Sequence, residues 1–387
     1  MPDGGYPRVE LIEEGLREGM QIESADISVD DKLTLIDALS RAGVPTIVVG
    51  SFVSPKWTPQ MANVDELIGR LRPLEGIVYT ALALNDRGRE RMAAFTPPLS
   101  PIPGPIRTMV HLCDVFVRRN TNRSQEEEIA SWPKTIARAV ETGASEAGIG
   151  INAAWGSNWL GKFSLDQRMS MLRRQYEAWS DAGLPVTSVW IGDPMAWNMP
   201  DAMEEQINAI LAEFPSITRF HLHLHNARGT APISAYTALK ALDPRHTLVL
   251  DTSIGGIGGC PYCGHGRMTK MIPTEDIVDL LHELGIDTGI DLDLLIEAGL
   301  LAEKIIGRSL YSHVTAAGPR PRGEKLFAMD MPFIETAEEA QHFRLGPSVY
   351  ADAPSPWRTP ISSPARSALH LARDNGTTAP APDGVSQ

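Results

Sequence analysis

The sequence predicts a parallel α/β fold, and within that class a (β/α)8 TIM barrel followed by a C-terminal extension. Short apolar runs rich in β-branched residues alternate with amphipathic helical segments from about residue 8 to residue 310. Eight such runs can be marked, whereas an open doubly wound sheet usually has fewer strands. Polar residues stand at the ends of several runs, which is where a barrel carries its chemistry.

The expected elements follow one another along the chain with recognisable start and stop signals. Strands are expected near residues 8–13, 45–50, 77–83, 106–112, 146–152, 186–192, 219–225 and 247–252. Ser28, Asn63, Ser124 and Ser164 each precede an acid or amide by three positions, which is typical of helix N-caps. Gly43 and Gly183 stand where the preceding helices should end.

We expect the barrel to span residues 1–315, and a partly ordered extension to span residues 316–350. Residues 351–387 are rich in Pro, Ser, Thr and Ala and are expected to be disordered.

Composition narrows the class of protein. The formal net charge of −13 argues against a nucleic-acid surface, which needs clustered Lys and Arg. No apolar run reaches the ~18 residues of a membrane span, and the start lacks the basic and apolar regions of a signal peptide. The three cysteines lack the spacing of a disulfide framework. A cytoplasmic protein with reduced thiols is expected.

Residues 219–226 read RFHLHLHN and place three histidines at every second position of a strand. His221, His223 and His225 therefore share one face, because successive side chains of a strand point to opposite faces. Imidazole is the commonest transition-metal ligand in proteins, but a buried histidine can also simply bond a backbone carbonyl. We expect His221, deepest in the run, to be such a core histidine and His223 and His225 to bind metal.

Further polar residues are expected at the same end of the barrel. Arg17 and Glu18 follow the first strand, Asn152 the fifth and Asp193 the sixth. The eighth strand leads into residues 251–266, a glycine-rich loop that contains Cys260. These loops are expected to converge on one site.

The chain resembles the 3-hydroxy-3-methylglutaryl-CoA (HMG-CoA) lyases, and more broadly the DRE-TIM metallolyase (HMGL-like) family that includes isopropylmalate and homocitrate synthases. The resemblance rests on GLREGMQIE (residues 15–23), SFVSPKWTPQM (51–61), VFVRRNTNRSQEE (115–127), HLHN (223–226), GGIGGCPY (255–262) and TEDIVDLL (274–281).

What the resemblance implies is a divalent metal cation held by Glu18, His223 and His225, with Arg17, Cys260 and His223 as catalytic residues. The implied reaction is a retro-aldol or retro-Claisen cleavage of a 3-hydroxyacyl-CoA to an enolate. The ion would lower the pKa of the substrate hydroxyl, Arg17 would hold the developing oxyanion, and Cys260 would protonate the carbanion. Substrate contacts are expected at Gln21, Asn152, Asp193 and Asn226, and a homodimer is implied.

Four positions depart from the family pattern. Glu18 replaces an Asp metal ligand, Val48 an active-site Glu, and Asn226 an Asp. Met271 stands where an Asn usually completes the metal shell, and a thioether is a poor ligand for a hard ion. We hypothesise that His265 substitutes, which would favour Zn²⁺ or Mn²⁺ over Mg²⁺.

These departures predict a substrate other than HMG-CoA itself, either a different acyl group or a free acid. Four tryptophans near the fifth and sixth strand ends are candidates for an apolar acyl pocket, although such residues are as often simple packing: Trp155, Trp159, Trp190 and Trp197. The alternative function is a Claisen-type synthase that condenses an acyl-CoA with a keto acid, and a third is a non-catalytic barrel. Cys260 and Cys263 form a CPYC pair that is a candidate regulatory disulfide.

Overall fold

The computed structural model describes residues 5–264 and 270–326. The chain divides into two units, Met1–Thr315 and Ala316–Gln387, and the first contains the sheet and the helices that surround it. His265, the tail expected at residues 351–387 and most of the extension expected at residues 316–350 lie outside the described residues. In the second unit the described part contains a single turn of 3₁₀ helix, Gly323–Lys325.

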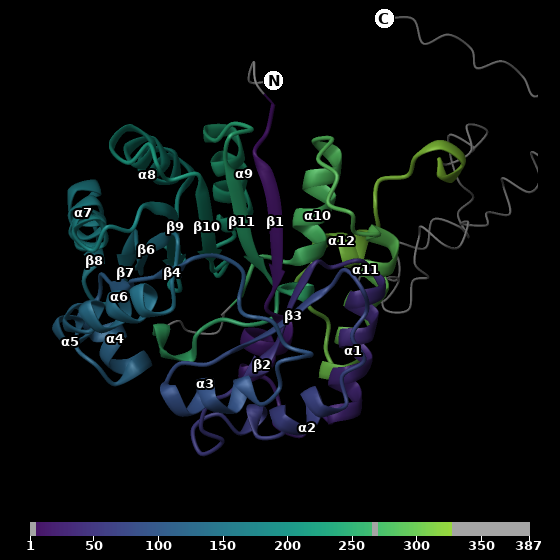
Figure 1. The fold of residues 1–387 in the computed structure, drawn as a ribbon. Helices are drawn as coiled ribbons and strands as arrows, with labels where there is room; N and C mark the ends of the chain where they lie inside the picture. Colours follow the sequence, from purple (N-terminus) through teal and green to yellow (C-terminus); the bar gives the residue numbers. More distant parts are fainter. Residues whose placement is uncertain (1–4, 265–269, 327–387) are drawn as a thin grey trace, which may run out of the picture. The chain divides into compact units, whose positions relative to one another are not determined.

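Parallel strands form one curved sheet with helices on its outside (Figure 1), as a TIM barrel requires. The hydrogen-bonded order is β3-β2-β1-β11-β10-β9-β6-β4, with β5 also beside β6. The strands are β1 Arg8–Glu13, β2 Thr46–Ser51, β3 Val78–Leu82, β4 Ile106–Arg107, β5 Val110–His111, β6 Ala147–Asn152, β9 Val186–Asp193, β10 Arg219–Leu224 and β11 Thr247–Thr252. Each expected strand is present, and β4 and β5 share the fourth place as two short pieces. A small antiparallel hairpin, β7 Gly156–Ser157 and β8 Gly161–Lys162, follows β6.

Helices connect successive strands. They are α1 Val29–Arg41, α2 Val64–Gly69, α3 Asp86–Ala93, α4 Asp114–Thr121, α5 Gln125–Ala130, α6 Trp132–Glu141, α7 Leu165–Asp181, α8 Pro200–Glu213, α9 Ala231–Ala241, α10 Thr274–Glu283, α11 Leu292–Ile306 and α12 His313–Ala317. Shorter turns are η1 Gly15–Gly19, η2 Met20–Ile22, η3 Pro59–Met61, η4 Ile254–Gly256 and η5 Pro261–Cys263. Among the described helices, none has both the length and the apolar character needed to cross a bilayer.

Three of the four predicted N-caps are confirmed. Ser28, Ser124 and Ser164 each accept a hydrogen bond from the backbone N–H three residues on, and Ser124 and Ser164 form complete capping boxes. The prediction for Asn63 is wrong, because its side chain makes no capping bond and instead accepts a hydrogen bond from Lys32 Nζ at 3.2 Å. The buried Lys32 ammonium group thus binds the Asn63 side-chain oxygen that would otherwise have capped α2.

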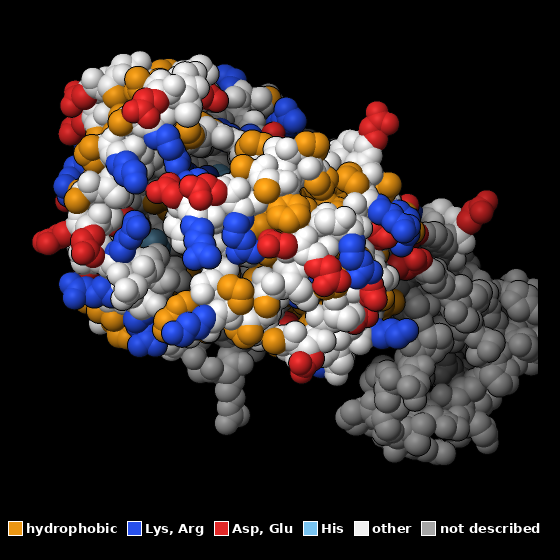
Figure 2. Space-filling view, turned by 60° about the horizontal axis from the view of Figure 1, so that its bottom comes forward, with side chains coloured by type: hydrophobic (Ala, Val, Ile, Leu, Met, Phe, Trp, Pro, Cys, Tyr) orange, Lys and Arg blue, Asp and Glu red, His pale blue; other side chains and the backbone are white. Residues whose placement is uncertain are grey.

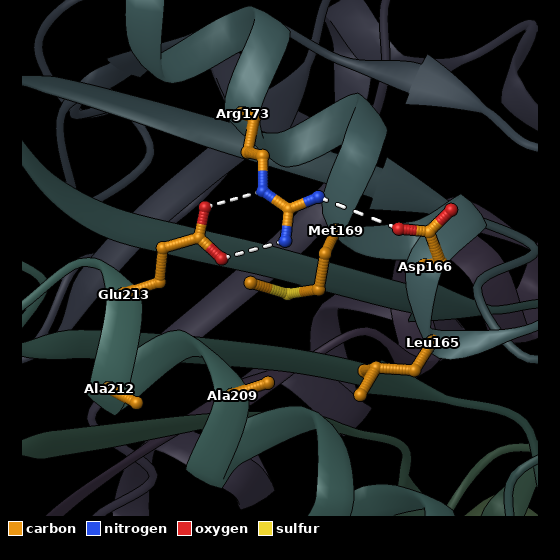
Figure 3. A pocket seen from close by; sticks show the side chains of 7 residues that line it. All are labelled: Leu165, Asp166, Met169, Arg173, Ala209, Ala212 and Glu213. Atoms are coloured by element: carbon orange, nitrogen blue, oxygen red, sulfur yellow. Dashed lines mark hydrogen bonds and ion pairs between the residues drawn. The ribbon is translucent and has the colours of Figure 1, made fainter.

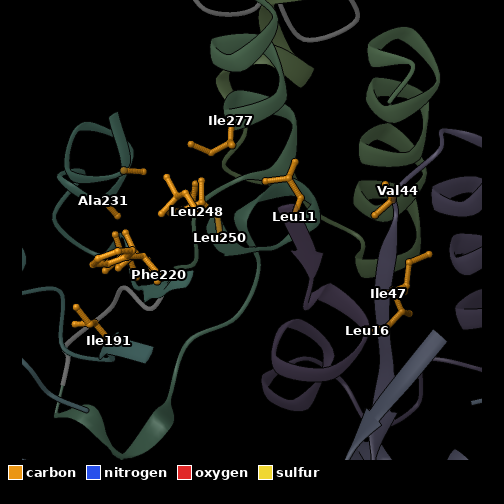
Figure 4. Close-up of a cluster of buried hydrophobic side chains, with 14 of the residues drawn as sticks. Leu11, Leu16, Val44, Ile47, Ile191, Phe220, Ala231, Leu248, Leu250 and Ile277 are labelled. Atoms are coloured by element: carbon orange, nitrogen blue, oxygen red, sulfur yellow. The ribbon is translucent and has the colours of Figure 1, made fainter. Parts of the chain in front are cut away.

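The two faces of the sheet differ sharply in polarity. The outward face packs against the helices in a large apolar core, to which β10 contributes Phe220, Leu222 and Leu224. Figure 4 shows Phe220 within this core, with Ile191 of β9 and Leu248 and Leu250 of β11. The inward face holds a small apolar cluster, Ile12, Val48 and Val249. Since the histidines of β10 alternate with its core residues, they point into the barrel.

Candidate metal centre and active site

Two imidazoles meet where β10 ends. His223 lies on the strand, and His225 lies one residue beyond it in an isolated antiparallel bridge with Met271. Both side chains are buried, and their Nε2 atoms are 3.2 Å apart. The alternation predicted for this run therefore brings His223 and His225 together at the carboxyl end of the strand.

Glu18 approaches the same point from the turn that follows β1. Its Oε1 lies 3.0 Å from His225 Nε2, and its Oε2 lies 3.4 Å from His223 Nε2. Within residues 5–264 and 270–326, these three side chains are the group whose ligand atoms all lie within 4.8 Å of one another. The Glu18 side chain, longer than the Asp of the family pattern, thus reaches the two imidazoles. Glu18 lies more than 200 positions before them in the sequence.

The backbone that carries Glu18 is a π-helical turn, η1, packed tightly against the glycine-rich loop. A Cβ on Gly19 would lie 2.6 Å from Ile257 Cγ1, and one on Gly258 would lie 3.2 Å from the Gly19 Cα. Glu13 ties the two segments together, since its Oε1 accepts hydrogen bonds from the backbone N–H groups of Gly15 at 2.7 Å and Ile254 at 2.8 Å. Burial raises the pKa of Glu13 to about 7, although these bonds oppose the rise.

Asp251, the last but one residue of β11, orients the histidines. Its Oδ2 lies 2.8 Å from His223 Nδ1 and its Oδ1 lies 2.7 Å from His221 Nε2. Burial opposes ionisation of Asp251, but the two imidazoles outweigh it and hold the pKa of the carboxyl below its usual range. An ionised carboxylate on Nδ1 leaves the Nε2 lone pair of His223 directed at Glu18 and His225, as in carboxylate–histidine–metal arrangements.

The expectation for His221 needs one correction. It is outside the group formed by Glu18, His223 and His225, as predicted for a core histidine, but its partner is the Asp251 carboxylate and not a backbone carbonyl. A barrel places the eighth strand beside the seventh, but the sequence does not give the register and side-chain rotamers that bring Asp251 to His221. Burial lowers the pKa of His221 despite Asp251.

The donor set fits a divalent cation. Two imidazole nitrogens and a carboxylate converge, and Glu18 and Asp251 place two buried negative charges around them. In the absence of a cation, burial lowers the pKa of His223, but the charge of Glu18 and the bonds to Asp251 and Glu18 raise it to about 10. A cation at this point would take the place of that proton and relieve the contact between the two Nε2 atoms.

Arg17 lies beside the group and is already partly engaged. Its Nε donates to Glu14 Oε2 at 2.7 Å, and its Nη1 lies 2.9 Å from Glu18 Oε2. Burial opposes the charged form, but Glu14 and Glu18 raise the pKa of Arg17 above its ordinary value. The second terminal nitrogen has no partner in the described chain, so it remains to donate to a substrate oxygen.

Cys260 begins the turn η5 on the glycine-rich loop. Its thiol is directed at Asn120 Oδ1, 3.7 Å away on α4, and Cys263 lies on the same turn. Both are free thiols. The Cys260 sulfur and burial raise the pKa of Cys263, and the charges of Glu18 and Asp193 add to the rise, so the CPYC turn lies within electrostatic range of the metal ligands.

The four expected substrate residues differ in their surroundings. Gln21 is partly buried and makes no side-chain hydrogen bond with the described chain, whereas Asn226 accepts a bond from Ala231 N at the start of α9. Asp193 is fully buried, and its Oδ2 accepts two bonds from Asn198, both 2.6 Å. Asn152 donates to His111 Nε2 at 3.0 Å. Their roles as substrate contacts stay predictions.

Sequence reasoning missed several polar partners near the site. Glu128 on α5 lies 2.8 Å from His111 Nδ1 and also accepts the His111 backbone N–H, so His111 presents Nε2 to Asn152. Glu14, Asp251 and His111 had no assigned role. Asp251 and His111 do end predicted strands, and that position is the signal from which they could have been found.

Comparisons with known proteins agree with this geometry. The family model described as HMGL-like matches residues 8–301. The chain belongs to this family. It is 31% identical over 315 residues to the mitochondrial hydroxymethylglutaryl-CoA lyase of Bos taurus, covering 81% of this chain and 91% of that protein.

Two bacterial relatives of this HMGL-like chain are similar over most of their length. The 3-hydroxy-3-isohexenylglutaryl-CoA/hydroxymethylglutaryl-CoA lyase of Pseudomonas aeruginosa is 31% identical over 310 residues, which are 80% of this chain and 97% of the relative. The crystal structure of the Bacillus subtilis HMG-CoA lyase matches with a TM-score of 0.66 and 29% identity, over 80% of this chain and 98% of that one. The predicted TIM barrel and lyase class are confirmed.

Among the described residues of this HMGL-like protein, Trp190 is the one of the four tryptophans that lies against a candidate metal ligand. Its ring stacks on that of His223 with centroids 5.5 Å apart. Trp155 is buried in the core and donates a hydrogen bond to Ala202 O. The Trp159 ring lies under the Arg119 guanidinium, and Trp197 Nε1 donates to Asn158 Oδ1. Trp155 therefore packs in the large apolar core beside α8.

The outer surface of the HMGL-like barrel carries a cleft whose chemistry differs from that of the candidate metal centre. A shallow cleft between α7 and α8 is lined by Met169 and Ala209 and crossed by the ion pair of Arg173 with Glu213 (Figure 3). Its charged groups are already paired with each other. On the face towards which the strands point, acidic and basic side chains are interspersed (Figure 2).

Proposed function

We propose that this protein is a metal-dependent carbon–carbon lyase that cleaves a 3-hydroxyacyl-CoA other than HMG-CoA by retro-aldol or retro-Claisen chemistry. The observation that carries the proposal is the convergence of Glu18, His223 and His225, backed by Asp251, at the carboxyl end of a TIM barrel. The names of the similar proteins supply the substrate class, an acyl-CoA thioester.

The residues of the site have distinct tasks in this reaction. Glu18, His223 and His225 would hold a divalent cation, Mg²⁺, Mn²⁺ or Zn²⁺, which when bound supplies a Lewis acid for substrate oxygens. Asp251 keeps the Nε2 lone pair of His223 directed at the site. Arg17 donates from its unengaged nitrogen to the oxyanion that develops as the carbon–carbon bond breaks.

Cys260 completes the cycle by delivering a proton to the enolate carbon. Its position on the glycine-rich loop, packed against the turn that carries Glu18, supports this role. His265, the proposed additional ligand, keeps that role as a hypothesis to be tested by His265→Ala.

The inner surface near the site supports an altered substrate. Val48 belongs to the apolar cluster with Ile12 and Val249, so no carboxylate stands at that position, and Trp190 covers one face of His223. A larger or differently branched acyl group is therefore proposed.

The experiment combines metal analysis with product analysis. Purified full-length protein should contain about one Mn²⁺, Zn²⁺ or Mg²⁺ per chain, and His223→Ala should lose it. His246→Ala is the matched control, because His246 is equally buried but pairs with Asp243. Cleavage of HMG-CoA and of larger 3-hydroxyacyl-CoA thioesters is then followed by chromatography. Protein that binds no metal and cleaves none of them would refute the proposal.

The alternative is condensation of an acyl-CoA with a keto acid at the same site. To distinguish condensation from cleavage, the protein is incubated with acetyl-CoA and 2-keto acids, and release of the free CoA thiol is measured. We also propose that the protein is a homodimer and that it is cytoplasmic. Sedimentation of the purified protein tests whether it is a dimer.

A further inference from the structure

One side of the barrel interior departs from the usual filling of branched aliphatic side chains. On β4, β6 and β9 the inward row contains Arg107, Gly148 and Ser188, which lie side by side in register. The next positions on β6 and β9 are Gly150 and Trp190, followed by Gly192 at the end of β9. The space above these glycines is occupied by long side chains, since a Cβ on Gly150 would meet Met109 Sδ at 2.3 Å and one on Gly192 would meet the Trp190 ring at 2.3 Å.

Arg107 extends across this row. Its guanidinium carbon lies 5.4 Å from the centroid of the Trp190 ring, a cation–π contact. Within residues 5–264 and 270–326 it forms no ion pair and no hydrogen bond, although five N–H groups are available. The neighbouring inward arginine, Arg219, shows the contrast, because it pairs with Glu10 at 2.6 Å.

Asp251 acts on Arg107 through its charge alone among the described residues. That charge favours the protonated guanidinium, but the hydrogen bonds of the Asp251 carboxylate go to His221 and His223. Burial lowers the pKa of Arg107, yet a guanidinium remains charged at neutral pH. Arg107 and Met109 are both only partly buried, so solvent reaches this inward row. The N–H groups of Arg107 are therefore accessible to a ligand, and a carboxylate could replace the water that solvates them.

The Trp190 ring links the guanidinium to the candidate metal centre and limits the distance between them. The Trp190 ring lies 5.4 Å from the Arg107 guanidinium carbon and 5.5 Å from the His223 ring centre, so these two cannot be more than about 11 Å apart. A short acyl branch can span that distance from a hydroxyl-bearing carbon at the metal.

We propose that Arg107 is a specificity-determining residue that binds a carboxylate on the acyl part of the substrate, in addition to the groups at the metal. The planar fork of a guanidinium matches a carboxylate through two parallel hydrogen bonds, and the Trp190 face holds the fork in position. The proposal rests on the proposed function and narrows its substrate to 3-hydroxyacyl-CoA thioesters with an anionic branch at C3.

The test uses two thioesters that differ in charge and match in size. The methyl group of HMG-CoA is replaced by 2-carboxyethyl in one and by 3-methylbutyl in the other, which has the same number of heavy atoms. For wild-type protein, kcat/KM should be on the order of 10- to 100-fold higher for the carboxyethyl thioester than for the 3-methylbutyl thioester. Arg107→Met should abolish that preference and change kcat/KM for the 3-methylbutyl thioester less than about 3-fold. Arg107→Lys should retain part of the preference for the carboxyethyl thioester.

A binding measurement separates this proposal from the proposed function. The free acids corresponding to the two thioesters are titrated calorimetrically into wild-type and Arg107→Met protein, with Mn²⁺ present. If neither thioester is cleaved but wild type alone prefers the tricarboxylic acid, the lyase function fails and the anion site stands. If wild type shows no preference in cleavage or binding, or if Arg107→Met weakens both ligands equally and lowers the melting temperature, Arg107 is structural and the anion site is refuted.

Discussion

Replacement of Asp251 by Asn should weaken metal binding without removing any metal ligand. The amide has the shape of the carboxylate, but one of its two ends donates where the carboxylate accepts. The Asp251 carboxylate lies 2.8 Å from His223 Nδ1 and 2.7 Å from His221 Nε2. In Asp251→Asn, the amide nitrogen must therefore face one of these two ring nitrogens. An amide nitrogen facing His223 Nδ1 moves the ring proton to Nε2, which is the atom directed at Glu18 and His225.

The size of the effect follows from this shift in tautomer and from the lost charge. Removal of a carboxylate behind a metal-bound histidine typically weakens the metal 10- to 100-fold, about 1.4 to 2.7 kcal/mol. We expect a loss in this range for Asp251→Asn, with a parallel fall in activity at subsaturating metal. Titration of the apoprotein with Mn²⁺ or Zn²⁺ against a chromophoric chelator measures it.

Two variants control for indirect effects. His221→Gln removes the other partner of Asp251 and should cost much less metal affinity, because the bond to His223 Nδ1 remains. Asp276→Asn changes a carboxylate that bonds Ser312 and His313 and should leave the affinity unchanged. If Asp251→Asn binds metal as tightly as wild type, or if Asp276→Asn loses as much, Asp251 does not orient the ligand.

Three further predictions test other parts of the fold. Burial raises the pKa of Glu275 to about 8, so the folded protein keeps a proton that the unfolded chain loses near pH 4.5, and the free energy of unfolding should fall as pH rises between these values. Urea titrations should show that Glu275→Gln reduces this slope by about 1.4 kcal/mol per pH unit, while the contribution of Glu13 remains; an unchanged slope would contradict the assignment. Ser164→Ala breaks a complete capping box and should cost ~1 kcal/mol of unfolding free energy in urea, whereas an unchanged midpoint would show that the box is unimportant. The Cys260 sulfur and burial raise the pKa of Cys263, so iodoacetamide at neutral pH should label it far more slowly in the native protein than in urea, as followed by mass spectrometry; equal rates would contradict the assignment.

The barrel and the convergence of His223 and His225 were predictable because their signals are local. A strand alternates its faces strictly, so His223 and His225 had to share one, and parallel strands must present their carboxyl ends together. Glu18 stands in the loop after the first strand, which predicts that it lies near the site, but its proposed role as a ligand came from the resemblance of GLREGMQIE to the family pattern. The N-cap at Ser164 depends on four consecutive residues and is likewise confirmed.

What the sequence could not reveal depends on register and on packing between distant segments. The barrel places β10 beside β11, but the pairing of His221 with Asp251 requires one particular register of these strands. The engagement of His111 by Glu128 requires α5 to fold back over β5. Asn63 failed as a cap because Lys32, 31 positions away, competes for its oxygen. Such contacts are set by packing between distant segments, and no short sequence pattern records them.

The polarity of the barrel interior has a consequence for folding. Because the inward apolar cluster contains only Ile12, Val48 and Val249, most of the hydrophobic free energy of this domain comes from the layer between sheet and helices. Substitutions such as Leu250→Ala in that layer should therefore endanger the fold, whereas changes along the inner row should mostly alter what the enzyme accepts. A barrel built in this way can exchange one substrate for another during evolution with little loss of thermodynamic stability.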